Sequence, residues 1–345
     1  MATPSLTKRL PEHIDLETLA EIAQRYGEVK VEAEVPLRDG TKVPVYSFAF
    51  GSTKKEVPTL GIIAGVHGLE RIGTRVVTAY LRSVCELLSW DETFKKTLQR
   101  CRLIFYPLVN PGGMYLQQRS NPNDVDLMRN APVESEGLSP WFIMGGQRIS
   151  PKLPWFRGKA DSEMELEAKA LCSFVTRELW ASKFSVSLDV HSGFGSVDRL
   201  WFPYAKTQEP FPHMAEVYGL KKLMDRTYPN HIYCVEPQSK QYLAHGDLWD
   251  FLYDQYEARE DKNIFLPLSL ELGSWSWVKK NPRQLFSVLG AFNPVLPHRR
   301  SRALRRHLLL FDFLLKSVVS NRTWAGLGKE DRQALHDEAF KFWYG

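Results

Sequence analysis

The chain has 345 residues, a hydrophobic fraction of 43%, a charged fraction of 25% and a formal net charge of +5. These values are ordinary for a globular protein, and so mild a charge says little about partners. The sequence contains no run of about 18 apolar residues, so we expect no transmembrane helix and no membrane partner. Lys8 and Arg9 are not followed by the apolar stretch of a secretory signal. We therefore expect a cytoplasmic protein.

The four cysteines are too scattered to indicate a thiolate metal site, because none forms a C-x-x-C pair. With no export signal, they are expected to be free and buried: Cys85, Cys101, Cys172 and Cys234.

The N-terminal part predicts a helix followed by a hairpin. Residues 11–26 have helical spacing, and residues 29–35 and 43–48 alternate apolar with polar side chains. The intervening Arg38-Asp39-Gly40-Thr41 is typical of a hairpin turn. We expect residues 1–52 to form a sheet edge or small lobe packed on a catalytic domain of residues 53–345.

The rest of the chain alternates buried strands with helices, which predicts an α/β fold. We expect a mostly parallel, doubly wound mixed sheet with helices on both faces. Expected strands lie at 61–66, 101–109, 184–190 and 264–272, and expected helices at 73–90, 161–182, 211–224, 246–256, 301–317 and 329–342. The irregular stretch 114–158 is long enough to be functional.

Four polar residues come at or just beyond the ends of predicted strands: His67, Glu70, His191 and Glu271. Open α/β sheets place active sites at the carboxyl ends of their strands. Two histidines and one carboxylate are a common ligand set for catalytic zinc. A further carboxylate, Glu271, is available to move protons. The sequence thus predicts a zinc hydrolase site.

Several motifs in order resemble those of the M14 zinc carboxypeptidases, over about residues 60 to 275. They are His67-Gly68-Leu69-Glu70, Asn110-Pro111-Gly112-Gly113, Val125-Asp126-Leu127-Met128-Arg129-Asn130, Leu188-Asp189-Val190-His191-Ser192, Tyr242 with Gly246 and Asp250, and Leu270-Glu271-Leu272.

The resemblance implies one Zn²⁺ ion, bound by His67, Glu70 and His191. Asp126 would hold His67 in one tautomer. Glu271 would take a proton from the zinc-activated water and deliver it to the leaving amine. Arg119 would stabilise the oxyanion, although Arg148 and Arg157 lie in the same loop and are alternatives.

The resemblance also implies the residues that contact the substrate. Arg129, with Asn130 beside it, would pair with the terminal carboxylate, and Tyr242 would cover the bound substrate. Trp249 stands where relatives shape the side-chain pocket. A structural ion pair between Asp126 and Arg129, and an ordinary half-buried Tyr242, are the alternatives.

One position departs from the family pattern. Met128 stands where digestive-type members have an asparagine that helps hold the terminal carboxylate, and a methionine cannot donate a strong hydrogen bond. The bulky Trp249, with Trp275 and Trp277, indicates a narrowed or aromatic pocket.

We therefore expect a zinc metallocarboxypeptidase acting on a peptide or N-acyl amino acid with a free carboxylate. The alternatives are a deacylase of the desuccinylase or aspartoacylase type and a cell-wall peptide amidase. The sequence does not indicate a preferred side chain or an oligomeric state.

A basic cluster occupies residues 298–306. No nucleic-acid-binding motif accompanies it, so we interpret it as a solvated helix face and expect no nucleic-acid partner.

Overall fold

A mixed sheet runs through the centre of the molecule, with strand order β1-β2-β4-β3-β5-β8-β6-β7. The structure is a computed structural model that describes residues 10–137, 143–260 and 263–345. The strands of these residues are β1 (Glu28–Pro36), β2 (Lys42–Gly51), β3 (Thr59–Ala64), β4 (Arg102–Tyr106), β5 (Phe184–Ser192), β6 (Arg199–Phe202), β7 (Cys234–Pro237) and β8 (Ile264–Leu272).

The four central strands are parallel, as the sequence predicts. β4, β3, β5 and β8 pair in parallel, whereas β1 with β2, β2 with β4, and β6 with β8 are antiparallel. Every residue of β3 and β5 is buried, which is typical of strands covered on both faces. The carboxyl ends of β3, β5 and β8 therefore meet at one edge of a rigid sheet.

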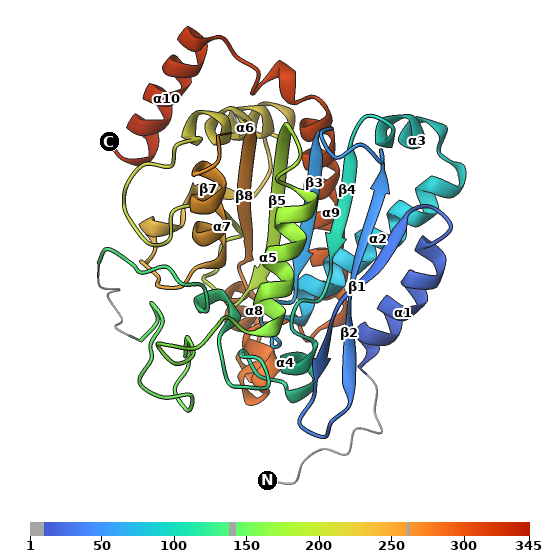
Figure 1. Ribbon diagram of the computed structural model, residues 1–345, viewed down its shortest axis with the longest axis vertical. Coiled ribbons are helices and arrows are strands. Elements are labelled where there is room, and N and C mark those ends of the chain that lie inside the picture. The colour runs from blue at the N-terminus through green and yellow to red at the C-terminus, as the bar shows by residue number, and fades with distance from the viewer. Residues whose placement is uncertain (1–9, 138–142, 261–262) are drawn as a thin grey trace.

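Helices cover both faces of the sheet. In Figure 1, α5 (Leu166–Glu178) crosses in front of the strands, while α2 (Arg71–Trp90) and α9 (Pro297–Val319) lie behind them. The remaining helices are α1 (Pro11–Ala23), α3 (Glu92–Leu98), α4 (Pro111–Leu116), α6 (Met214–Thr227), α7 (Leu248–Glu257), α8 (Trp275–Lys280) and α10 (Lys329–Trp343). This arrangement confirms the predicted α/β class.

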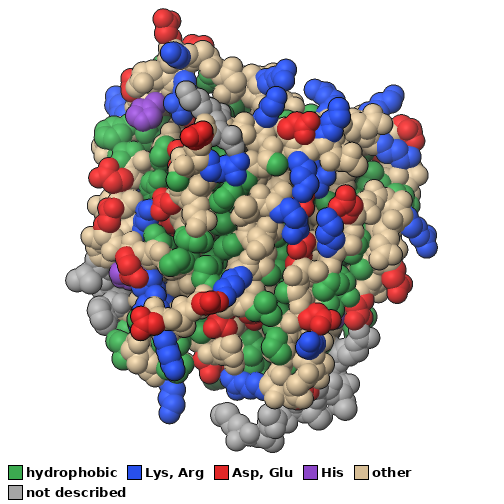
Figure 2. All heavy atoms as spheres, in the orientation of Figure 1, with side chains coloured by type: hydrophobic (Ala, Val, Ile, Leu, Met, Phe, Trp, Pro, Cys, Tyr) green, Lys and Arg blue, Asp and Glu red, His purple; other side chains and the backbone are tan. Residues whose placement is uncertain are grey.

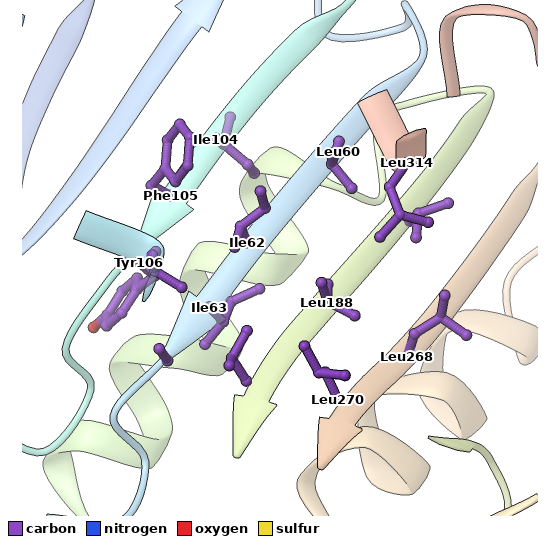
Figure 3. Packing of buried hydrophobic residues seen from close by; sticks show 14 of the residues in the cluster. Leu60, Ile62, Ile63, Ile104, Phe105, Tyr106, Leu188, Leu268, Leu270 and Leu314 are labelled. Atoms are coloured by element: carbon purple, nitrogen blue, oxygen red, sulfur yellow. The ribbon is translucent and has the colours of Figure 1, made fainter. Parts of the chain in front are cut away.

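One layer of the core fills the space between the sheet and α9. Figure 3 shows side chains of neighbouring strands beside Leu314 of α9, among them Leu60, Leu188 and Leu268. Each of these four residues is at most 1% exposed. Burial of a leucine side chain stabilises a fold by about 1.5–3 kcal/mol, so this layer fixes the strands that carry the site.

The N-terminal residues join the main sheet. The predicted hairpin forms: β1 and β2 pair antiparallel, and Gly40 at the turn has φ +87°. Since β2 also pairs with β4, the hairpin is the edge of the sheet. The division of the chain at residues 52 and 53 stays a prediction.

Two further features concern the polarity of the helices and the charge of the surface. Across the described residues, the longest helices are too short or too polar to cross a membrane. On the face shown in Figure 2, basic and acidic side chains are interspersed, so this face carries no continuous field of one sign.

Candidate active site

Three neighbouring strands deliver the predicted residues to one place. His67 and Glu70 lie in the loop between β3 and α2, His191 lies near the end of β5, and Glu271 near the end of β8. His191 and Glu271 are paired residues of parallel strands, so their side chains leave the same face of the sheet. Residues distant in sequence are thus neighbours in space.

The loop after β3 is held by close backbone packing. A Cβ on Gly68 would lie 2.1 Å from the carbonyl carbon of Gly113, so only glycine fits there. Asn110 caps α4 by accepting from the Gly113 N–H at 2.7 Å, and it donates to the Val66 carbonyl at 3.2 Å. The Asn-Pro-Gly-Gly motif therefore positions the segment that carries His67 and Glu70.

His67 and His191 face Glu70 in the same way. Nδ1 of His67 lies 2.8 Å from Oε1 of Glu70, and Nδ1 of His191 lies 3.1 Å from Oε2. One ligand atom from each of the three residues lies within 4.8 Å of the others. All three side chains are buried, at 2–4% exposure. The two imidazoles and the carboxylate converge on one small volume.

Each imidazole is held from behind by an aspartate. Asp126 lies 3.2 Å from Nε2 of His67, and Asp189 lies 2.8 Å from Nε2 of His191. A carboxylate at Nε2 favours the tautomer with its proton there and leaves the Nδ1 lone pair free for a metal. Both histidines therefore present Nδ1 toward the centre of the site.

Asp189 was not assigned a role from the sequence. Besides His191, it accepts a hydrogen bond from the indole N–H of Trp249 at 3.0 Å. The alternation of a strand places Asp189 and His191 on one face, two residues apart, and this D-x-H spacing is the sequence signal that could have indicated the contact. The partner, Trp249, comes from α7 and could not be read from spacing.

The charges of the site shift its pKa values in opposite directions. Burial raises the pKa of the Glu70 carboxyl, but His67 and His191 outweigh burial and hold that pKa well below its usual range. Burial lowers the pKa of His191, but Asp189 and Glu70 raise it well above the usual value. Burial raises the pKa of Glu271 to about 8, with Glu70 adding to the effect. The pKa of Glu271 is thus shifted upward, whereas that of Glu70 is shifted downward.

Of the three arginines considered for the oxyanion, Arg119 lies at the site. Its Nε donates to Asp126 at 2.8 Å and its Nη1 to Glu70 at 3.4 Å. Arg148 donates to the carbonyls of residues 158 and 159, and Arg157 pairs with Glu134. The structure therefore favours Arg119.

Arg129 and Tyr242 lie together beside the site. Nη2 of Arg129 donates to the Tyr242 hydroxyl at 3.3 Å, and Nη1 lies 3.9 Å from the Asp247 carboxylate. Arg129 is only 3% exposed. Met128 is buried, and its backbone N–H donates to Asp126 while its carbonyl accepts from Nη1 of Arg129 at 3.2 Å. Arg129 is therefore held in place beside Tyr242 and Asp247. Its role as the partner of a substrate carboxylate stays a prediction.

The other two predicted substrate residues make contacts within the chain. Asn130 donates to the Arg157 carbonyl at 3.0 Å and accepts from the Glu165 N–H at 2.6 Å, which favours a role in holding the loop. Trp249 is 3% exposed, and its N–H is used by Asp189. Substrate contact by these two residues stays a prediction.

The donor set fits zinc. Zn²⁺ prefers imidazole nitrogen and carboxylate oxygen in a tetrahedral site, and a catalytic site keeps one position open. His67, Glu70 and His191 supply three such ligands, each oriented by a further contact. The nearby Glu271 has a buried Oε2 atom without a hydrogen-bond partner in the described part of the chain, as expected for a group that faces the open position.

Comparison with known proteins agrees with this geometry. A family model described as zinc carboxypeptidase matches residues 35–273. Carboxypeptidase A1 of Rattus norvegicus is 25% identical over 195 residues, 53% of this chain and 43% of that protein. Carboxypeptidase SOL1 of Arabidopsis thaliana is 22% identical over 235 residues, 64% of this chain and 41% of that protein. The chain spans less than half the length of these curated relatives.

Solved structures share the fold. Bovine thrombin-activatable fibrinolysis inhibitor, in complex with tick carboxypeptidase inhibitor, aligns with a TM-score of 0.64 at 19% identity, covering 91% of this chain and 98% of that one. Carboxypeptidase A from Helicoverpa armigera aligns with a TM-score of 0.55 at 17% identity, covering 84% and 76%. With the family match over most of the chain, these likenesses lead to one conclusion: the chain belongs to the zinc carboxypeptidase family.

Proposed function

We propose that the protein is a zinc carboxypeptidase that hydrolyses the C-terminal peptide bond of its substrate. The observation that carries the proposal is the position of Glu271, paired with His191 across β5 and β8 and beside the triad His67, Glu70 and His191. A metal-binding triad alone would suit a structural ion. A carboxylate with a raised pKa beside that triad supports hydrolysis.

A Zn²⁺ ion held by the triad would polarise the scissile carbonyl and lower the pKa of water. Glu271 accepts a proton from the attacking water and passes it to the leaving amine. A general base works best when its pKa lies near the operating pH, and burial raises the pKa of Glu271 to about 8. This value belongs to the metal-free site, and a bound Zn²⁺ would lower the pKa of Glu271, so that the carboxylate can take up a proton from water and then release it.

Arg119 stabilises the negative charge that develops on the carbonyl oxygen. Its guanidinium group is already oriented by Asp126 and Glu70, so little rearrangement is needed as the charge forms. Preorganised donors of this kind are worth about 10²–10³ in turnover in other enzymes.

Arg129 binds the free carboxylate of the substrate, and Tyr242 orders this side of the site. A buried guanidinium suits a carboxylate because two parallel N–H groups match two oxygens. Asp247 lies 3.9 Å from Nη1 of Arg129 and partly balances its charge in the absence of substrate. The substrate class we propose is a peptide with a free C-terminal carboxylate.

The test is mass spectrometry of a mixed pool of peptides and N-acyl amino acids incubated with the zinc-loaded protein. We expect loss of single C-terminal residues. Glu271→Gln should keep zinc and lose about 10²–10⁴-fold in turnover, and the exposed Glu330→Gln serves as the matched control. Release of acyl groups alone would overturn the proposed carboxypeptidase activity. Near wild-type turnover by Glu271→Gln would overturn the assignment of Glu271 as the general base.

A further inference from the structure

A cavity lies beside the first turn of α2, outside the zinc site. It measures about 240 Å³ and is lined by Arg71 and Arg75 of α2, by Arg300 of α9, and by residues 287–295. That segment includes η4 (Val288–Ala291). Pockets for drug-sized ligands measure roughly 300–1,000 Å³, so an occupant here is small.

The cavity carries an excess of positive charge. Arg71 and Arg75 both donate to the buried carboxylate of Glu12, with Arg75 Nε at 2.7 Å from Oε1. Within the described parts of the chain, the guanidinium of Arg300 has no hydrogen bond or ion pair. Three guanidinium groups therefore face one carboxylate, which leaves two positive charges uncompensated.

Like charges held together in a partly enclosed space repel one another. Burial lowers the pKa of Arg300, and its neighbours Arg75 and Arg71 lower it further, against the opposing effect of Glu12. A bound anion with two negative charges would balance the cavity. Guanidinium groups bind such anions through paired N–H groups.

Part of the cavity wall is apolar, which favours a ligand that carries a small apolar group. Ile72, Leu289 and Val295 line the cavity with the arginines. Val295 is 47% exposed, so an apolar group placed against it would remove surface from water. A phosphate monoester carries a charge of −1.5 to −2 at pH 7, which matches the excess better than a single carboxylate does.

We propose that Arg71, Arg75 and Arg300 form a binding site for a small phosphate monoester that bears an apolar group. The site is separate from the peptidase chemistry and shares no residue with the triad. It adjoins the triad, since Arg71 follows Glu70. Asn293, at the cavity wall, accepts from the Ile72 N–H and donates to the Leu69 carbonyl, both at 2.8 Å. Of the other arginines of residues 298–306, Arg302 and Arg305 are exposed, as expected for a solvated face, whereas Arg299 donates to the Trp277 carbonyl and Arg306 to Asp198.

The probe is phenyl phosphate, titrated calorimetrically into the zinc-loaded protein. We expect saturable binding, weaker binding of inorganic phosphate and still weaker binding of benzoate, which has the ring but one charge. Arg300→Gln should weaken phenyl phosphate binding about tenfold or more. Because Arg300 has no partner in the described structure, its loss should leave folding and peptidase turnover unchanged.

Two variants separate this site from other sources of anion binding. Arg305→Gln makes the same charge change on the exposed side of α9 and should bind like the wild type. Arg129→Gln removes a cation of the active site and should also leave this affinity unchanged. The proposal is overturned if phenyl phosphate does not saturate the wild type, if Arg300→Gln binds it equally well, or if binding is lost in Arg129→Gln instead.

Discussion

The imidazoles of His67 and His191 are oriented alike but supported differently. Asp126, behind His67, also accepts from Arg119, whereas Asp189, behind His191, also accepts from the buried indole of Trp249. The two aspartates differ in their further partners. Arg119 is charged and contacts Glu70 of the triad, whereas Trp249 is uncharged and buried. Replacing Asp189 should therefore change metal binding without removing a group that contacts the substrate.

We predict that Asp189→Asn weakens zinc affinity by about 10–100-fold, because an amide no longer favours the proton on Nε2 of His191. The measurement is competition for zinc with a chelator of known affinity. Trp249→Phe should give a smaller loss, since Asp189 then keeps its contact with His191.

The control for this prediction is Ser187→Ala, which alters the same buried face of β5 two residues away. It should bind zinc like the wild type. Equal zinc affinity in Asp189→Asn and the wild type would show that Asp189 does not position His191.

At the scale of elements, the sequence predicts the central strands and misses the short ones. β6 and β7 span four residues each, too few for a clear alternation. α5 was expected to begin at residue 161 but begins at Leu166. There the Glu165 N–H is bound by Asn130, from a loop distant in sequence. Local patterns fix what lies within one element, and contacts between loops decide where an element begins.

The turn before α7 depends on one glycine. Gly246 has φ +70°, and a Cβ there would lie 1.9 Å from the carbonyl oxygen of Arg129. Gly246→Ala should therefore push Arg129 away from its position, raise KM for peptides and lower the free energy of unfolding. Peptide kinetics and denaturant unfolding measure the two effects.

Gly40→Ala is the matched control, because Gly40 has φ +87° and no atom within 4 Å of the added Cβ. It should cost only the strain of the left-handed backbone, about 1–2 kcal/mol, with KM unchanged. A KM for Gly246→Ala equal to that of Gly40→Ala would contradict the role given to this turn.

At the scale of the whole molecule, we expect stability to depend on pH through a histidine far from the zinc triad in sequence. His307 of α9 is 1% exposed. Burial lowers its pKa to about 4, although Asp198 opposes the change. The unfolded chain binds a proton at this residue below about pH 6.5, whereas the folded chain does so only near pH 4. The stabilising effect is therefore complete above pH 6.5 and is lost as the pH falls.

We predict that the free energy of unfolding falls by about 1.4 kcal/mol per pH unit from this residue alone, between about pH 6.5 and 4. Denaturant unfolding across this range should show a steeper decline for the wild type than for His307→Gln. The exposed His298→Gln should decline like the wild type. Parallel curves for the wild type and His307→Gln would contradict the prediction.

The central claim is that one zinc ion, held by His67, Glu70 and His191, supports removal of C-terminal residues. The most direct measurement is a titration of the metal-free protein with zinc, following the release of a C-terminal amino acid from a peptide. We predict that turnover rises in proportion to zinc and levels off at one equivalent per chain. Activity without metal, or activity that rises beyond one equivalent, would contradict the account.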